Sequence, residues 1–403
     1  MNIRHRKKAS MQEALLIVAI CSTLLNVFFR TVPLGGVATL FGYTAIIASF
    51  LYPVFLVLWG GKMKWQELSC LMLFIFIAIV SIVTGIELLG SGTLYDMFYP
   101  LLSFIVFYCS LCFTHKKPNK ININRIFGIN YLFCAVYIFA LISPFTNKYI
   151  EVNEWGGKVF TMGLGNPNAV ACYVMFPFIL LCIQLQSIKK TLSKVLHLGV
   201  IGILAYILIL LKSRTVIFCC LAILAYSLFG TRIKIRKWMI RLCMLIPIVM
   251  VIVQMALANL DVNIDILEKP IATGRDGLYG PILEAFNERP FSFIFGELCR
   301  YRLGNYHNSP ITIVASLGVA GFVVYWIFWS FFLRSINEQA STNTQKVALF
   351  SLLACMVHSS SETLYTMGYI PFSAFFLVFV LIAKGEIAVL NQNDSSQEGK
   401  QQE

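Results

Sequence analysis

The sequence predicts an all-α, polytopic membrane protein with about twelve transmembrane helices and one large outer loop between the ninth and tenth spans. Of the 403 residues, 58% are apolar and 13% are charged, and the mean hydropathy is +0.76. The apolar residues form runs about as long as a bilayer is thick, separated by short charged or Pro/Gly-containing breaks. A soluble domain of this length needs far more polar surface.

The apolar runs place spans near 12–29, 37–59, 67–86, 95–114, 125–143, 168–186, 195–211, 215–229, 239–259, 308–332, 347–365 and 370–390. The first run follows a basic start but no small-x-small cleavage site, so we expect a retained helix and not a signal peptide. The chain then divides into 1–259 with spans one to nine, 260–307 as an outer subdomain, 308–390 with spans ten to twelve, and 391–403 as a polar, disordered tail.

The charges predict the orientation of these spans. Threading them alternately from a cytoplasmic N-terminus puts 22 of the 32 Lys and Arg residues in inner segments and 12 of the 19 Asp and Glu residues outside. Cytoplasmic loops carry this excess of Lys and Arg. We therefore expect a multi-pass protein of the bacterial cytoplasmic membrane with both termini inside. The same rule explains the net charge of +13, which is then no sign of a nucleic-acid partner.

The cysteines indicate packing and not a metal or disulfide framework. Eleven of the twelve lie in apolar runs, and Cys299 alone falls in the long outer loop, where it has no loop partner. Cys109 and Cys112 form a C-x-x-C within one span, without a second pair at zinc spacing. We find no P-loop, G-x-G-x-x-G or H-E-x-x-H motif in the sequence. No metal and no other cofactor is expected.

The connection between the seventh and eighth spans is too short to leave the membrane. Only 37 residues separate Lys194 from Arg232, whereas two spans of about 20 residues need about 40. The turn Lys212-Ser213-Arg214 is therefore expected at or below the outer membrane surface, facing a wet cavity or a partner and not lipid. Arg214 is a candidate functional cation, because a guanidinium can bind two oxygens of a phosphate or pyrophosphate at once.

His307 stands at the mouth of the tenth span, in Tyr306-His307-Asn308-Ser309-Pro310. Ser309 followed by Pro310 predicts a helix start, with Ser as the cap and Pro at the first helical position. This start leaves His307 unexplained, and a histidine at a membrane mouth can act as a base near neutral pH. The run Asn166-Pro167-Asn168 predicts a capped start of the sixth span in the same way.

Other ionisable residues allow a structural explanation. His358 and Glu362, near the outer end of the eleventh span, fit a functional role and a hydrogen-bonded packing role equally well. The charged residues of 260–310 mostly fit a solvated loop.

Several short motifs follow one another on the predicted outer side. They are GLGNPNA at 163–169, Lys212-Ser213-Arg214, TGRDGLY at 273–279, the stretch 290–296, YHNSP at 306–310 and LGVAG at 317–321. In order, spacing and sidedness they resemble the superfamily of O-antigen ligases and Wzy-type polysaccharide polymerases. The resemblance covers roughly the C-terminal 60% of the chain by motif and the whole chain by topology.

The resemblance implies a metal-independent, inverting glycosyl transfer at the outer face, with a glycan on undecaprenyl pyrophosphate as donor. By similarity, Arg214 and Arg275 would hold the pyrophosphate and stabilise it as it leaves. His307 would orient or deprotonate the acceptor hydroxyl. Arg289, Arg300 and Arg302 are alternatives to Arg275 in the same loop. The residues expected to contact substrate are Arg214, Arg275, Asn168, Asn308, Arg302 and Tyr279.

We expect a polymerase that joins lipid-linked repeat units into an O-antigen, capsule or exopolysaccharide. The same motifs allow a ligase that delivers the finished glycan to lipid A core or another acceptor. A lipid-linked oligosaccharide flippase, from another class, would favour two similar halves and charges lining the spans to the cytoplasmic side. A metal-dependent polyprenyl-phosphate-sugar transferase would place acids in the first outer loop, and residues 30–36 contain none. The expected partners are the donor and acceptor lipids and the bilayer, with a flippase and a chain-length regulator as candidates.

Overall fold

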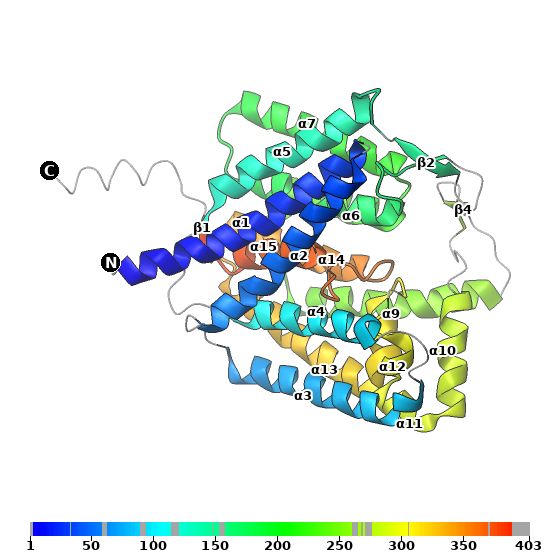
Figure 1. The fold of residues 1–403 in the computed structure, drawn as a ribbon. Helices are drawn as coiled ribbons and strands as arrows, with labels where there is room; N and C mark the ends of the chain where they lie inside the picture. Colours follow the sequence, from blue (N-terminus) through cyan, green and yellow to red (C-terminus); the bar gives the residue numbers. More distant parts are fainter. Residues whose placement is uncertain are drawn as a thin grey trace.

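The computed structural model describes residues 3–32, 34–58, 63–88, 94–113, 121–146, 148–152, 158–259, 265–266, 269–270, 276–304, 306–369 and 371–388. Most helices run alongside one another in a single bundle (Figure 1). The helices are α1 (Ile3–Thr31), α2 (Gly35–Leu58), α3 (Trp65–Thr84), η1 (Ile86–Leu88), α4 (Leu94–Cys112), α5 (Ile123–Ile142), α6 (Pro167–Gln184), α7 (Thr191–Leu210), α8 (Arg214–Ala225), the π-helix η2 (Tyr226–Gly230), α9 (Lys237–Asn259), α10 (Asp276–Glu288), α11 (Pro290–Phe295), α12 (Leu298–Tyr301), α13 (Ser309–Gln339), α14 (Asn343–His358) and α15 (Phe372–Ala383).

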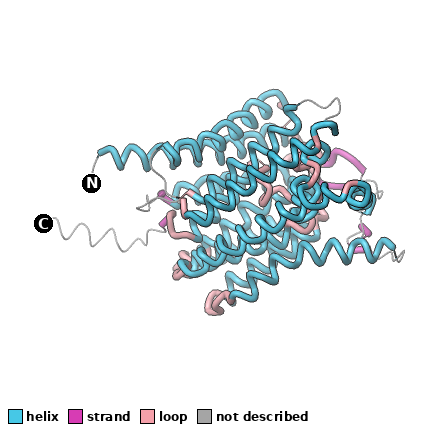
Figure 2. Tube along the Cα trace, turned by 90° about the horizontal axis from the view of Figure 1, so that it is seen from below, coloured by secondary structure: helices cyan, strands magenta, loops and turns pink. Residues whose placement is uncertain are grey.

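Short strands form three two-stranded ribbons at the two ends of the bundle (Figure 2). Strand β1 (Ile121–Asn122) pairs in parallel with β6 (Ile387–Ala388). Strand β2 (Tyr149–Val152) pairs antiparallel with β3 (Lys158–Phe160), and β4 (Asp265–Ile266) pairs antiparallel with β5 (Lys269–Pro270).

The all-α membrane class is confirmed. Among the described residues, nine helices are long and apolar enough to cross a bilayer, namely α1 to α7, α9 and α13. The remaining predicted spans, the eighth, eleventh and twelfth, coincide with the shorter helices α8, α14 and α15. The count of twelve spans stays a prediction, and the predicted tail 391–403 lies outside the described residues.

The helix ends that the charge pattern assigns to the cytoplasm lie together at one end of the bundle. Arg125 at the start of α5 pairs with Glu13 of α1 at 2.9 Å. Lys64, before α3, donates a 2.7 Å hydrogen bond to Ser335 near the end of α13. The β1–β6 pair joins the start of α5 to the segment after α15, and the first turns of α1 also lie at this end (Figure 1). We call it the inner end, and its position in the cytoplasm stays a prediction.

At the opposite, outer end, α10 lies across the bundle (Figure 1). Its buried side chains Ile282, Ala285 and Phe286 pack with Tyr301 of α12 and Ala315 of α13. The described part of the long outer segment is therefore packed onto the bundle, although 260–264, 267–268 and 271–275 are not described.

The tenth predicted span is not one straight helix. Gly318 within α13 has φ +67° and ψ −173°, which are not helical angles. A straight helix would separate residues 309 and 325 by about 24 Å, yet the Tyr325 side chain reaches the side chains of Ser309 and Thr366. Residues 309–317 therefore fold back along the long segment 319–339. A Cβ at Gly318 would collide with the backbone of Ile294, so glycine is required where α11 crosses this turn.

Two short helices leave irregular backbone within the depth of a bilayer. At about 1.5 Å per residue, α14 is about 24 Å long and α15 about 18 Å, against a hydrocarbon core of about 30 Å. Helix α14 begins and α15 ends near the inner end, where Gln345 of α14 lies against Gly385 after α15. Measured from the inner end, their outer ends and the connecting residues 359–369 therefore stop short of a full hydrocarbon thickness, and we expect them below the outer surface. Irregular backbone at that depth must be buried in protein or line a wet cavity.

Candidate functional site

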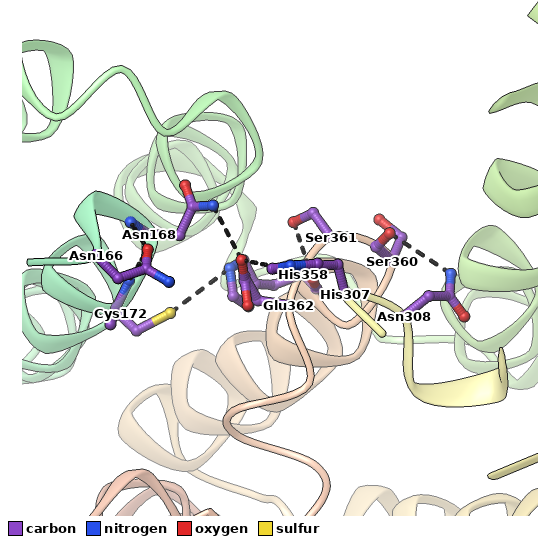
Figure 3. Close-up of polar contacts among 10 residues, drawn as sticks. Asn166, Asn168, Cys172, His307, Asn308, His358, Ser360, Ser361 and Glu362 are labelled. Atoms are coloured by element: carbon purple, nitrogen blue, oxygen red, sulfur yellow. Dashed lines mark hydrogen bonds and ion pairs between the residues drawn. The ribbon is translucent and has the colours of Figure 1, made fainter. Parts of the chain in front are cut away.

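The connection between α14 and α15 carries a buried carboxylate that two predicted site residues contact. Glu362 has only 2% of its side chain exposed. Its Oε1 lies 2.8 Å from Nδ1 of His307 and accepts a 2.9 Å hydrogen bond from Nδ2 of Asn168. The three side chains converge from the outer ends of α6, α13 and α14 (Figure 3). The structure therefore brings together Asn168 and His307, and adds Glu362.

The contact with Glu362 defines the chemistry that His307 can perform. An ionised carboxylate only accepts, so it takes a hydrogen bond from a protonated Nδ1 and leaves the lone pair of a neutral imidazole on Nε2. The carboxylate also stabilises the imidazolium that forms when Nε2 takes a proton. The His307 side chain is 31% exposed, whereas its carboxylate partner is buried. This is the arrangement of an oriented general base.

Local backbone geometry places His307 at the turn into α13. His307 has φ +55°, in the left-handed region that non-glycine residues rarely occupy. The next residue, Asn308, caps α13 by accepting a 3.2 Å hydrogen bond from the Ile311 amide. The predicted Ser309 cap is therefore wrong. Asn308 is favoured over Ser309 as the cap because its amide side chain makes a second contact. Its Nδ2 donates a hydrogen bond to the Pro247 carbonyl at 2.8 Å.

The predicted start of the sixth span is confirmed. Asn166 caps α6 by accepting from the backbone amides of Asn168 and Ala169, and Pro167 is the first helical residue. This cap fixes the first turn of α6, from which the Asn168 side chain reaches Glu362.

Below Glu362 the site has a buried floor. His358, with 1% of its surface exposed, lies 3.7 Å from Sγ of Cys172 through its Nε2. The Tyr365 hydroxyl donates a hydrogen bond to the Cys172 carbonyl, which ties the connection between α14 and α15 to α6. His358 and Glu362 were equally open to functional and packing roles. Their surroundings separate them, because Glu362 meets a partly exposed histidine and His358 meets buried side chains.

Arg214 begins α8 at a depth that matches this site. The Cys219 thiol of α8 donates to the Ala354 carbonyl of α14. Arg214 lies five residues outward from Cys219, and His358 lies four residues outward from Ala354. At about 1.5 Å per residue, both stand roughly 6–8 Å above that shared level. Helix α8 and η2 together span only residues 214–230, and the depth of this turn in a membrane stays a prediction.

The remaining predicted residues lie elsewhere. Arg275 lies outside the described residues. Tyr279 of α10 is buried, with 1% exposed, and Asn308 is committed to the capping contacts above. Arg302 follows α12 and pairs with Asp96 of α4 at 3.4 Å. Of the three that the structure describes, Arg302 is the one with a partly exposed side chain.

Glu362, like His358, is a residue that the sequence left open between a functional and a packing role. The signal was the polar run HSSSET at 358–363, which interrupts an otherwise apolar stretch. In the described part of the chain, no three His, Cys, Asp or Glu side chains are grouped to hold a metal ion.

The fold and this site define a class: an α-helical membrane protein with several apolar helices long enough to cross a bilayer and a buried carboxylate paired with a partly exposed histidine. No protein-family model and no curated protein matches the chain.

Proposed function

We propose that the chain is a membrane glycosyltransferase that polymerises undecaprenyl-pyrophosphate-linked oligosaccharide repeat units. The observation that supports the proposal is the contact between His307 and buried Glu362, at the end of the bundle opposite the β1–β6 pair. Such a base, next to a lipid phase, suits a substrate with a polar hydroxyl and a long apolar carrier. The motif resemblance supplies the substrate class.

The proposed step exchanges one glycosidic bond for another. The acceptor hydroxyl oxygen attacks the anomeric carbon of the donor glycan, and its proton passes to Nε2 of His307. The bond from that carbon to the pyrophosphate breaks with inversion, and undecaprenyl pyrophosphate leaves with the electron pair. Arg214, and Arg275 by resemblance, stabilise the negative charge on the leaving group.

A polymerase and a ligase differ in the acceptor to which they transfer the glycan. A polymerase transfers the growing chain to the next lipid-linked repeat unit, and a ligase transfers it to lipid A core or another acceptor. Both use the same base and the same leaving group, so the site fits both, and we propose the polymerase.

The test is a reaction of the purified protein with undecaprenyl-pyrophosphate-linked repeat units in EDTA, followed by gel and mass spectrometry. We expect a ladder of repeat lengths with released undecaprenyl pyrophosphate, and no ladder from His307→Gln. Transfer only after lipid A core or another acceptor is added would replace polymerase with ligase. Absence of transfer with all of these acceptors would contradict glycosyl transfer and favour a flippase.

A further inference from the structure

Part of the long outer segment is hydrogen-bonded to α3 at a level that its helix length places within a bilayer. Helix α3 begins after Lys64, with Trp65, a cation and an aromatic residue typical of membrane interfaces. Ser81 lies about 24 Å along the helix from Trp65, which is less than a hydrocarbon thickness of about 30 Å. The Ser81 hydroxyl accepts a 2.9 Å hydrogen bond from the Leu298 amide of α12 and donates to the Ser316 carbonyl at 3.1 Å. The start of α12 therefore lies at the level of Ser81.

Two ion pairs hold the ends of this segment further out. Arg289, just before α11, pairs with Glu87 of η1 at 3.1 Å, and both side chains are exposed. Glu87 lies roughly 9 Å beyond Ser81, and the six-residue helix α11 is about equally long. After α12, Arg302 pairs at 3.4 Å with Asp96 in the first turn of α4. The chain thus runs inward through α11, turns, and runs outward again through α12.

The turn between α11 and α12 satisfies its polar groups with protein. The Glu297 amide donates to the Ala315 carbonyl of α13 at 2.9 Å. The Glu297 carboxylate, with 1% of the side chain exposed, accepts a 2.9 Å hydrogen bond from the Ser292 hydroxyl through Oε1. Its Oε2 lies 3.6 Å from the guanidinium of Arg300. Irregular backbone and charged groups are tolerated at bilayer depth under this condition.

The same segment leaves three large apolar side chains exposed on α11. Phe291, Phe293 and Ile294 are 52%, 50% and 47% exposed. Helix α11 lies beside the outer end of α3 and also packs on α13 (Figure 1). Both long helices carry exposed apolar residues near this level, among them Val83 on α3 and Val323 on α13, and such residues face lipid on a spanning helix. The exposed face of α11 therefore continues the lipid-facing surface of its neighbours.

We infer that residues 290–301 form a re-entrant segment and that the exposed face of α11 binds the acyl chains of phospholipids in the leaflet at the outer end. The contact is apolar and does not select an anionic headgroup. The three arginines of the segment's borders and turn are each paired with a carboxylate, namely Arg289, Arg300 and Arg302. The inference does not depend on the proposed function, since it uses only the depth and the exposed side chains.

The first experiment measures what surrounds α11 in a bilayer. A nitroxide is attached to Phe293→Cys in a cysteine-free background, and the protein is placed in vesicles of phosphatidylethanolamine and phosphatidylglycerol. Oxygen reaches labels in acyl chains, whereas a nickel chelate reaches labels in water. The matched controls are Phe76→Cys, on the exposed face of α3, and Asn287→Cys, on the exposed face of α10.

We expect the Phe293 label to resemble the Phe76 label, with high oxygen accessibility and loss of the nickel accessibility seen at Asn287. Nickel accessibility equal to that at Asn287 would place α11 in water and overturn the inference. Protection from both reagents would also overturn it, because another protein surface would then cover this face.

The second experiment keeps all native cysteines. The photoreactive residue p-benzoylphenylalanine replaces Phe293 or, as control, Asn287, and the full-length protein is irradiated in the same vesicles. Its excited ketone takes a hydrogen atom from a nearby C–H group, and the two carbon radicals join. Mass spectrometry should find a phospholipid adduct at position 293 and none at position 287. A cross-linked dimer at position 293, or equal lipid adducts at both positions, would contradict the lipid contact.

Discussion

Replacing Glu362 by Gln tests the pair on which the proposed function depends. Gln has nearly the same shape, so it fills the same buried space between His307 and Asn168. It is neutral, however, and its amide can donate as well as accept. An amide N–H directed at Nδ1 of His307 moves the ring proton to Nε2, where the base is needed.

The structure sets the size of the expected effect. A hydrogen bond to a charged group contributes about 1.5–3 kcal/mol, which corresponds to about 10- to 150-fold in rate. Inverting the histidine tautomer adds to this, and a carboxylate-to-amide change beside a catalytic histidine costs about 10⁴-fold where it has been worked through. We therefore expect kcat to fall by about 10²- to 10⁴-fold. KM for the donor should stay the same, because Glu362 contacts the base and not the pyrophosphate.

The assay is the initial rate of ladder formation, with thermal unfolding of the detergent-solubilised protein as a check on folding. The matched control is Glu284→Gln, on the exposed face of α10 at the same end of the bundle. Glu362→Gln removes a buried charge, so its thermal stability should not fall. Glu284→Gln should match wild type in both measurements.

A double variant makes the test decisive. If Glu362 acts through His307, the variant carrying both Glu362→Gln and His307→Gln should be no slower than His307→Gln alone. Effects that multiply would show that Glu362 acts independently. Full activity of Glu362→Gln beside an inactive His307→Gln would refute the positioning role.

Three further predictions address the rest of the molecule. Arg214→Lys keeps the charge but loses the guanidinium that can bind two oxygens at once, so turnover should fall about tenfold or more. Full turnover would contradict the role of Arg214 in binding the pyrophosphate. Gly318→Ala forces a side chain into a left-handed turn against the α11 backbone, at about 1–2 kcal/mol for the angle alone. It should lower the melting temperature, whereas Gly199→Ala, with open space around it, should not; equal melting temperatures would argue against the close crossing. In a cysteine-free background, a membrane-impermeant maleimide applied to spheroplasts should label Asn287→Cys but not Ser341→Cys, and the reverse labelling would invert the topology.

The sequence predicted the helices well because hydrophobic run length is a local property. Lipid-facing helices must satisfy every backbone hydrogen bond internally, so each span is visible without knowledge of its neighbours. The depth expected for Arg214 rests on the same local property, since it follows from counting residues between two basic loops, and it stays a prediction. The Asn166 cap is also local, and it was correct.

The features that were missed depend on contacts between distant segments. The fold-back at Gly318 is set by the α11 backbone crossing it, more than twenty residues earlier in the chain. The pairing of His307 with Glu362 joins residues 55 apart. The incorrect cap at Ser309 has a similar cause, because Asn308 is favoured by its bond to Pro247 on another helix. Residue spacing carries no information about such partners.

Helix α14 is short and contains polar residues, which has a consequence for biosynthesis. Its sixteen residues include Lys346, Ser351 and His358, and it does not reach the length and apolarity of a spanning helix. An insertion machinery that reads hydrophobicity one segment at a time gains little from α14 alone. The strongly apolar α13 can insert into the membrane by itself. It then gives α14 a protein surface to pack against in place of lipid. Newly made chains are therefore expected to complete the candidate site last, after the C-terminal helices have packed against their neighbours.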